Sequence, residues 1–318
     1  MPKTPVRLLI AGAGSRGAGY ARFAEQHPDR ARVVAVAEPR PEALERLART
    51  HGIPAANVFR NWREAAARPR LADAVLICTQ DADHADPAVA FAGLDYHILL
   101  EKPMAPTEAE CRRIVGAVQG RPLVFAVCHV MRYTAYTEKL KALLDSGRIG
   151  DLVTLQHIER VGYWHQAHSF VRGNWRNMKE SSFMLLAKSC HDLDWIRYLM
   201  GAPCRRVSSF GGLYHFRPDR APAGAAARCL DCAVEPACPY SALKLYLGNL
   251  RRGNRDWPLN VLTDDLTEAG VRQALRDGPY GRCVYACDND VVDHQVVNLE
   301  FEGGRSAAFT MTAFSGDI

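Results

Sequence analysis

Several features are missing from this sequence, and each absence excludes a class of protein. No apolar stretch approaches the length of a membrane-spanning helix, so a transmembrane protein is not expected. No run of five or more like charges occurs, although the formal net charge is +5, so the basic stripe of a nucleic-acid-binding protein is missing. An apolar strand starts at Val6 with no signal peptide before it, which predicts a cytoplasmic protein.

Lysine is scarce as well. Only seven of the 40 basic residues are lysines, so Lys102 and Lys188, which lie inside sequence motifs, are notable. The chain has 10 cysteines, and in a cytoplasmic protein these are expected to be thiols or metal ligands and not disulfides. Cys78, Cys111 and Cys128 have the surroundings of small buried hydrophobic residues.

The first part of the chain alternates apolar strands with helices. Strands are predicted at 6–11, 32–37, 74–79, 96–100 and 123–128, and helices at 16–26, 41–51, 83–93 and 106–118. This alternation is typical of a parallel sheet with right-handed crossovers. We therefore predict an α/β Rossmann domain over residues 1–130.

Residues 131–318 have a different pattern, typical of an α+β domain. The expected elements are a helix at 133–146, a strand at 149–160, a loop at 163–176, a helix at 182–200, a Cys-rich insertion at about 204–290, and strands at 291–301 and 305–313 joined by Gly303-Gly304. These elements predict an open-faced, mostly antiparallel sheet with a helix on one face.

A glycine-rich turn follows the first strand. Gly12, Gly14 and Gly17 form a G-x-G-x-x-G motif that also contains Ser15 and Arg16 and opens a helix. Such glycines let the backbone approach a pyrophosphate at a helix N-terminus. Glu38 ends the second strand, where an acidic residue binds ribose hydroxyls and repels a 2′-phosphate. The motif therefore predicts NAD binding in preference to NADP, a preference that Arg40 could soften.

Two more polar segments follow buried strands of the predicted parallel sheet. Thr79, Gln80 and His84 belong to the first, and Glu101 and Lys102 to the second. Loops at the carboxyl ends of parallel strands line the cofactor cleft, so these residues are predicted to be cofactor-binding. The alternative for the first segment is a polar loop with a helix cap.

Together these motifs resemble the glucose–fructose oxidoreductase, inositol dehydrogenase and rhizopine-catabolism (Gfo/Idh/MocA) family. The resemblance is carried in chain order by GAGSRG (12–17), AEP (37–39), ICTQDADH (77–84), EKP (101–103) and CHDLD (190–194). It implies a Rossmann domain followed by an open-faced sheet domain, with substrate bound between them. It also implies that Lys102 lies near the nicotinamide and the substrate hydroxyl, and that His191 is the family histidine.

The chain departs from the family pattern at two places. Many members have an aspartate four residues before the histidine, where this chain has Ala187. Lys188 instead precedes His191 by three residues, which predicts a position on the same helix face and a part in catalysis. The chain also ends soon after its last strand, where members usually continue, so the sheet is expected to lack strands.

Oxidising a secondary alcohol requires a hydride acceptor and a base for the hydroxyl proton. Nicotinamide accepts the hydride, and Lys102 and His191 are the predicted acid–base residues. The simpler alternatives are a surface lysine in a turn and a core histidine paired with Asp192 or Asp194.

Aromatic and polar side chains gather in residues 163–176. Sugars are recognised by aromatic stacking and by hydrogen bonds to their hydroxyls, so this segment is predicted to contact substrate. Arg172 could also bind an anionic group on the substrate. The predicted substrate-binding residues are His129, Arg132, Trp164, His165, Arg172 and Trp175. The alternative is a loop anchored on the sheet by its tryptophans.

The Cys-rich insertion predicts a metal site. Cys229 and Cys232 have metal-ligand spacing, Cys238 follows, and Cys283 is the predicted fourth ligand, with Cys287 and Cys204 as substitutes. Thiolates on loops suit a structural zinc ion. An iron–sulfur cluster and unligated thiols are the alternatives.

The sequence thus predicts an NAD-dependent oxidoreductase that transfers a hydride between a sugar or polyol secondary alcohol and nicotinamide. Two alternatives remain open: an enzyme that uses NAD transiently for oxidation and elimination, and a non-catalytic NAD-binding regulatory protein. The expected partners are a small-molecule sugar or polyol and further copies of the chain, since open-faced sheets commonly pair with another subunit.

Overall fold

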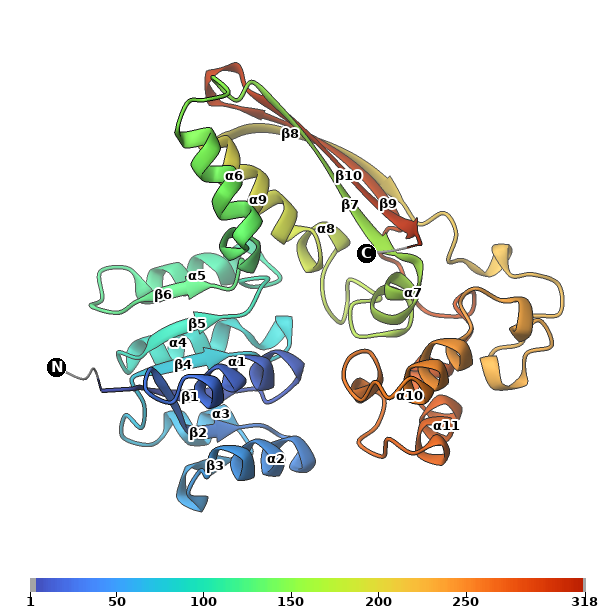
Figure 1. The fold of residues 1–318 in the computed structure, drawn as a ribbon, viewed down its shortest axis with the longest axis horizontal. Helices are drawn as coiled ribbons and strands as arrows, with labels where there is room; N and C mark the ends of the chain where they lie inside the picture. The colour runs from blue at the N-terminus through green and yellow to red at the C-terminus, as the bar shows by residue number, and fades with distance from the viewer. Residues whose placement is uncertain (1–3, 317–318) are drawn as a thin grey trace. The chain divides into compact units, whose positions relative to one another are not determined.

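The computed structural model describes residues 4–316, which form two compact units that divide between Cys128 and His129. The boundary predicted from the sequence, at residue 130, lies two residues further along the chain. Within residues 4–316, no helix is long and apolar enough to cross a membrane. Figure 1 shows the chain, and the two units are described separately below.

The first unit is built on a six-stranded parallel sheet in the order β3-β2-β1-β4-β5-β6. Its strands are β1 (Val6–Ala11), β2 (Ala31–Ala37), β3 (Val58–Phe59), β4 (Ala74–Ile77), β5 (His97–Leu100) and β6 (Phe125–Val127). Its helices are α1 (Ser15–Gln26), α2 (Pro41–His51), α3 (Trp62–Ala66), α4 (Ala85–Gly93) and α5 (Glu108–Val118).

Helices cover both faces of this sheet, because the buried strands are apolar on both sides. One core cluster includes Phe91 of α4 and Ile114 of α5. The other includes Leu44 and Leu47 of α2. This architecture confirms the predicted Rossmann fold, and the strand order reverses between β1 and β4. Ligands of such folds bind at the carboxyl ends of the strands at that reversal.

The second unit contains a four-stranded mixed sheet in the order β7-β10-β9-β8. Its elements are α6 (Ala135–Asp145), β7 (Thr154–Gly162), α7 (Tyr163–His165), α8 (Met184–Ala187), α9 (Cys190–Met200), β8 (Cys204–Gly212), α10 (Gly248–Arg251), α11 (Glu268–Asp277), β9 (His294–Phe301) and β10 (Ser306–Ser315). β9 pairs antiparallel with both β8 and β10, whereas β7 pairs parallel with β10. The sheet is therefore mostly antiparallel, as predicted.

Helices pack on one face of this sheet and leave the other face open. Trp195 and Leu199 of α9 share a core cluster with Val297 and Phe309 of the sheet, and α6 and α9 run along the same side of it (Figure 1). The opposite face is apolar in part. Ile158, Thr310, Val296 and Phe210 form a cross-strand row there, and Phe210 is 73% exposed.

Three expectations for this unit were wrong. The helix predicted at 182–200 is broken between Ala187 and Cys190 into α8 and α9. The predicted loop at 163–176 is largely helical, because α7 continues into the wider helical turns of Gln166–Arg172. The insertion predicted from residue 204 begins later, since Cys204–Gly212 is an edge strand of the sheet.

The helical segment Gln166–Arg172 is buried throughout and contains a histidine. The Nδ1 atom of His168 lies 2.7 Å from the Tyr246 hydroxyl. Burial is the main cause that lowers the pKa of His168 from 6.5 to about 3, and the charges of His165 and Arg172 add to it. The folded protein therefore binds fewer protons at this site than the unfolded chain. The contribution of neutral His168 to the free energy of unfolding is therefore present above pH 6.5 and is lost as the pH falls towards 3.

We expect His168→Gln to reduce the acid sensitivity of folding. A glutamine can still bond Tyr246 but does not titrate, so the slope of unfolding free energy against pH should fall by up to about 1.4 kcal/mol per pH unit. Urea denaturation at several pH values below neutrality measures this slope. His27→Gln, at an exposed site, is the matched control. Parallel pH curves for His168→Gln and the wild type would contradict the expectation.

Candidate functional site

The glycine-rich turn between β1 and α1 has the shape of a phosphate cradle. Gly12 has a φ of +97°, and a Cβ there would lie 2.4 Å from the Cys78 carbonyl oxygen. A Cβ on Gly17 would lie 1.9 Å from the Gly12 carbonyl oxygen. Gly14 caps α1 without a side-chain hydrogen bond to the first turn, so backbone N–H groups there can bind phosphate. Ser15 and Arg16, which begin α1, are exposed.

Glu38 lies next to this turn, at the end of β2. Its carboxylate accepts hydrogen bonds from the Ala13 N–H at 2.7 Å and from the Arg40 Nε at 2.8 Å. Burial alone would raise the pKa of Glu38, but the hydrogen bonds from Arg40 and Ala13 outweigh it and lower that pKa. The carboxylate is therefore ionised at neutral pH, in the place where sequence analysis expects a ribose to bind.

The other predicted cofactor residues follow β4 and β5 at the same edge of the sheet. Ile77, the last residue of β4, pairs with Ala11 of β1 on one side and Leu100 of β5 on the other. The three loops that follow these strands are therefore neighbours, and the parallel topology brings together residues that the sequence separates. This set comprises Gly12, Gly14, Gly17, Thr79, Gln80, His84, Glu101 and Lys102.

His84 and Glu101 position these loops. His84 is buried, and its ring nitrogens lie 2.8 Å from the Pro103 carbonyl oxygen and 3.2 Å from that of Thr79. Glu101, also buried, accepts hydrogen bonds from the Tyr20 hydroxyl at 2.6 Å and from the Lys102 N–H at 2.9 Å. The backbone at Lys102 is thus fixed from two sides, and direct cofactor contacts of His84 and Glu101 stay predictions.

Tyr20 is a further residue of this region that the sequence motifs did not indicate. It lies one turn after Gly17 on α1, and its hydroxyl reaches Glu101. Burial is the main cause that raises the pKa of Tyr20, so the hydroxyl stays protonated and can donate to the Glu101 carboxylate. Its position three residues after Gly17 places Tyr20 on the same face of α1 and could have indicated it, but no sequence pattern predicts its hydrogen bond with Glu101.

In the second unit, His191 lies in the first turn of α9 beside other polar groups. Its ring packs edge-on against His129, with centroids 6.1 Å apart. Arg132 donates to both oxygens of Asp194, at 2.7 and 2.5 Å, and the His129 ring lies 4.0 Å from the same carboxylate. His191 is half-buried, and its neighbours His129 and Arg132 are two of the six residues predicted to bind substrate.

Lys188 does not lie on the same helix as His191. It follows α8 at the break, so the spacing that predicted a shared helix face does not apply. Its ammonium pairs with Glu159 of β7. His157, on the same strand, bonds Asp192 of α9 at 2.7 Å. Sequence analysis did not single out Glu159 or His157.

Glu159, His157 and Asp192 form a compact polar cluster between the sheet and the helices. One ligand atom from each lies within 4.8 Å of the others, a spacing that could hold a cation. The Lys188 ammonium, paired with Glu159, supplies a positive charge to this cluster. The local role of Lys188 is therefore to neutralise a half-buried carboxylate.

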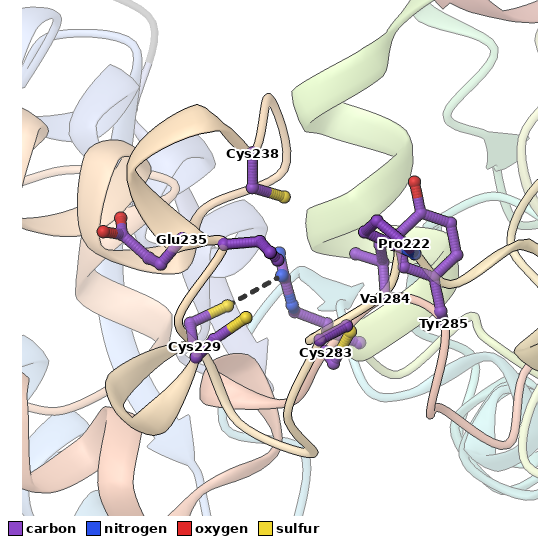
Figure 2. Close-up of a pocket in the computed structure, with 11 residues that line it drawn as sticks. Pro222, Cys229, Glu235, Cys238, Cys283, Val284 and Tyr285 are labelled. Atoms are coloured by element: carbon purple, nitrogen blue, oxygen red, sulfur yellow. Dashed lines mark hydrogen bonds between the residues drawn. The ribbon is translucent and has the colours of Figure 1, made fainter.

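The residues predicted from segment 163–176 are dispersed by its helical conformation. Trp164 and His165 pack against Trp257, with centroids 5.3 and 5.0 Å away, and both are half-buried. Trp175 packs on Phe170 at the edge of the sheet core. The four predicted metal ligands Cys229, Cys232, Cys238 and Cys283 line one pocket (Figure 2).

Arg172 faces that pocket. It is 1% exposed and donates to the carbonyl oxygens of Arg282 and Tyr240, at 2.7 and 2.8 Å. This burial removes the guanidinium from solvent, so the prediction that Arg172 binds an anionic substrate has no support from its position.

Two family models match the chain in sequence. Residues 6–129 match the oxidoreductase family with an NAD-binding Rossmann fold, and residues 137–232 match the Gfo/Idh/MocA C-terminal domain. The protein therefore belongs to the Gfo/Idh/MocA oxidoreductase family.

Curated relatives are similar over part of their length. The chain is 33% identical to inositol 2-dehydrogenase of Streptomyces avermitilis, over 63% of this chain and 55% of the relative. It is 29% identical to 2,7-anhydro-N-acetylneuraminate hydratase of Escherichia coli, over 66% of this chain and 54% of the relative. The chain thus spans about half the length of these relatives.

Solved structures share the fold. The WlbA dehydrogenase of Chromobacterium violaceum, solved with NADH and UDP-GlcNAcA, superposes with a TM-score of 0.67 at 16% identity, covering 99% of this chain and 69% of that one. The myo-inositol 2-dehydrogenase of Lactobacillus plantarum gives 0.66 at 15% identity, covering 98% and 71%.

Proposed function

We propose that this protein is an NAD-dependent oxidoreductase that transfers a hydride between a sugar or polyol secondary alcohol and nicotinamide. The observation that carries the proposal is the position of Lys102. It follows β5 at the sheet edge that also bears the glycine cradle, and Glu101 fixes its backbone. The inositol dehydrogenases among the relatives support a polyol substrate.

The residues at this edge fit a dinucleotide. The space at Gly12 and Gly17 admits no side chain, and the uncapped start of α1 offers N–H donors to a pyrophosphate. Glu38 would accept hydrogen bonds from ribose hydroxyls. When bound, the nicotinamide supplies the hydride acceptor.

Lys102 and His191 are the residues proposed to bind the substrate hydroxyl and to transfer its proton. Lys102 would hold the substrate hydroxyl and accept its proton as the carbon–hydrogen bond breaks. His191, half-buried beside His129, would hydrogen-bond the substrate and assist that proton transfer. The proposal requires the two units to bring these side chains to one substrate.

The protein is expected to bind NAD at least about tenfold more tightly than NADP, a difference of about 1.4 kcal/mol. The ionised Glu38 carboxylate would repel the 2′-phosphate of NADP, and Arg40 offsets only part of that repulsion because it is already paired with Glu38. Calorimetric titration of both cofactors measures the ratio. Glu38→Gln should narrow the preference for NAD and Arg40→Ala should widen it. Equal or tighter NADP binding by the wild type would contradict this expectation.

A second function is favoured by two hydratases among the relatives. The hydratase of Escherichia coli acts on an anhydro sugar, which suits an enzyme that uses NAD transiently for oxidation and elimination. Such an enzyme needs a second base, and a histidine such as His165 could serve. Net conversion of an anhydro sugar without accumulation of NADH would favour this alternative.

Steady-state assays with a panel of polyols, sugars and sugar acids test the proposal. Formation of NADH with one class of these compounds supports a dehydrogenase. Tight NAD binding with no conversion of any compound would favour the third possibility, a non-catalytic NAD-binding regulatory protein.

We also propose a homo-oligomer formed through the open sheet face. Ile158, Val296 and Phe210 expose 61%, 43% and 73% of their surface there, an apolar row suited to a second copy of the chain. Phe210→Glu should lower the oligomeric state measured by light scattering.

A further inference from the structure

Three separated stretches of the insertion converge on the pocket in Figure 2. Cys229 and Cys232 come from one short turn, Cys238 from the next, and Cys283 from the segment after α11. Outside this pocket, the remaining cysteines are distributed over both units, and all ten are free of disulfides.

Backbone contacts and two hydrophobic clusters hold these stretches together. The Cys283 N–H donates to the Ala227 carbonyl at 2.8 Å, and Arg228 forms an isolated antiparallel bridge with Arg282. The Arg228 guanidinium donates to the carbonyl oxygens of Leu275, in the last turn of α11, and of Gly278, directly after it, at 3.0 and 2.9 Å. These contacts, on either side of the cysteines, fix the positions of the segments that line the pocket.

Arg172 introduces a buried positive charge into this pocket. Its Nη2 atom donates to the Cys229 sulfur at 3.6 Å, the bond that is dashed in Figure 2. Its Nη1 atom is buried and has no hydrogen-bond partner. Among residues 4–316, no carboxylate lies within ion-pair distance of this guanidinium, and Glu235 of the same pocket bonds Ser241 instead.

A buried guanidinium without an anion is strongly destabilising, because the charge loses its hydration. The groups beside Arg172 that can become anionic together are the cysteines. Four thiolates around a doubly charged zinc ion leave an excess of two negative charges. A metal–thiolate centre would therefore neutralise Arg172, whereas four neutral thiols would leave its charge unbalanced.

We propose that Cys229, Cys232, Cys238 and Cys283 bind a metal centre as thiolates and that Arg172 is its buried counter-charge. The centre would have a structural role and would stabilise the irregular insertion, because all four ligands come from the protein and leave no position open for a substrate. The inference is independent of the NAD chemistry proposed above.

The spacing of the sulfur atoms affects which metal centre the four cysteines can bind. No three ligand atoms of these cysteines lie within 4.8 Å of one another. Zn–S bonds of about 2.3 Å hold the sulfurs of a tetrahedral site about 3.8 Å apart, so zinc, the metal that the sequence predicts, requires these side chains to rotate inwards. A 4Fe–4S cluster binds each of four thiolates to a separate iron and therefore accepts wider spacing between the sulfurs. Both are thiolate centres, and the metal content distinguishes them.

Elemental and acid-labile sulfide analysis of the full chain, purified without oxygen, tests the proposal. We expect either about one zinc per chain or several irons with a matching amount of sulfide. Cys232→Ser and Cys238→Ser should lose most of the metal. Cys204→Ser, on the exposed β8 strand, and Cys111→Ser, in the first unit, should retain it.

Arg172→Met tests the counter-charge, with Arg172→Lys as the charge-conserving variant. We expect the Met variant to lose metal to a chelator at least about tenfold faster than the Lys variant, since a neutral side chain leaves the excess thiolate charge unbalanced. Should the Met variant not fold, chelator treatment of the wild type keeps the proposal testable: metal release should raise hydrogen exchange in residues 213–290. Wild-type protein that contains no metal, with all ten thiols titrated after denaturation, would overturn the proposal, as would full metal retention in Cys232→Ser and Cys238→Ser.

Discussion

Replacing Lys102 with alanine is expected to lower kcat by on the order of 10²–10⁴-fold, with little change in NAD affinity. The variant removes the proposed partner of the substrate hydroxyl proton. The glycine cradle and Glu38, which are proposed to bind the dinucleotide, lie elsewhere along the sheet edge and keep their own contacts. Steady-state kinetics with the best polyol from the substrate panel, together with NAD titration, measure both quantities.

Lys139→Ala provides the matched control, because Lys139 is exposed on α6 and belongs to no proposed site. It should leave kcat and NAD affinity unchanged. A Lys102→Ala enzyme with near wild-type kcat would show that another group takes the proton. Loss of NAD binding in that variant would instead give Lys102 a role in holding the cofactor.

Replacing His191 with alanine is expected to lower kcat by about 10²-fold, the low end of the range for a positioned acid–base group. The reason is the place of His191 beside His129 and near the Arg132–Asp194 pair, the group of polar side chains predicted to meet substrate. His191→Gln should restore part of the rate, because glutamine can still hydrogen-bond a substrate hydroxyl.

Lys188 gives the comparison that separates catalysis from packing. If the ion pair with Glu159 is the main role of Lys188, Lys188→Met should lower the unfolding midpoint and have only a small effect on kcat. The double change at 188 and 191 should then have additive effects on kcat. A more than additive loss would mean that Lys188 shares the proton-transfer role, as its sequence position suggested. An unchanged kcat in His191→Ala would contradict the role proposed for this histidine.

The first unit was predictable because its signals are local. Buried apolar runs such as Val6–Ala11 end in polar or glycine-rich loops, and parallel pairing places those loops at one edge. The sequence could not indicate which residues of these loops hydrogen-bond to one another. The Tyr20–Glu101 and His84–Pro103 contacts depend on side-chain directions that no spacing reveals.

The second unit was less predictable, because tertiary contacts override local patterns there. Residues 182–200 contain no glycine or proline, yet the helix breaks next to Lys188, whose side chain pairs with Glu159 on β7. The seven residues of Gln166–Arg172 are all buried, polar and apolar alike, so their burial does not follow the amphipathic period that indicates a helix.

The cysteine spacing predicted that a metal binds here, which stays a proposal, and Cys283 lies in the same pocket as the three cysteines of the motif. Arg172 was assigned to substrate because an arginine among aromatic residues is typical of a binding loop. Its burial among distant segments gives that interpretation no support. Arg172 lies at the end of the wide helical turns of Gln166–Arg172 and lines the pocket of the cysteines.

The most direct test of the proposed activity is a single-turnover measurement of NADH absorbance after the NAD-loaded protein is mixed with the best polyol from the panel. We expect a rise to a stable level of about one NADH per chain, slowed when the carbinol carbon carries deuterium and nearly abolished in Lys102→Ala. A rise followed by a fall to zero would indicate oxidation and elimination. No absorbance change with any sugar, sugar acid or polyol that the NAD-loaded protein binds would contradict hydride transfer.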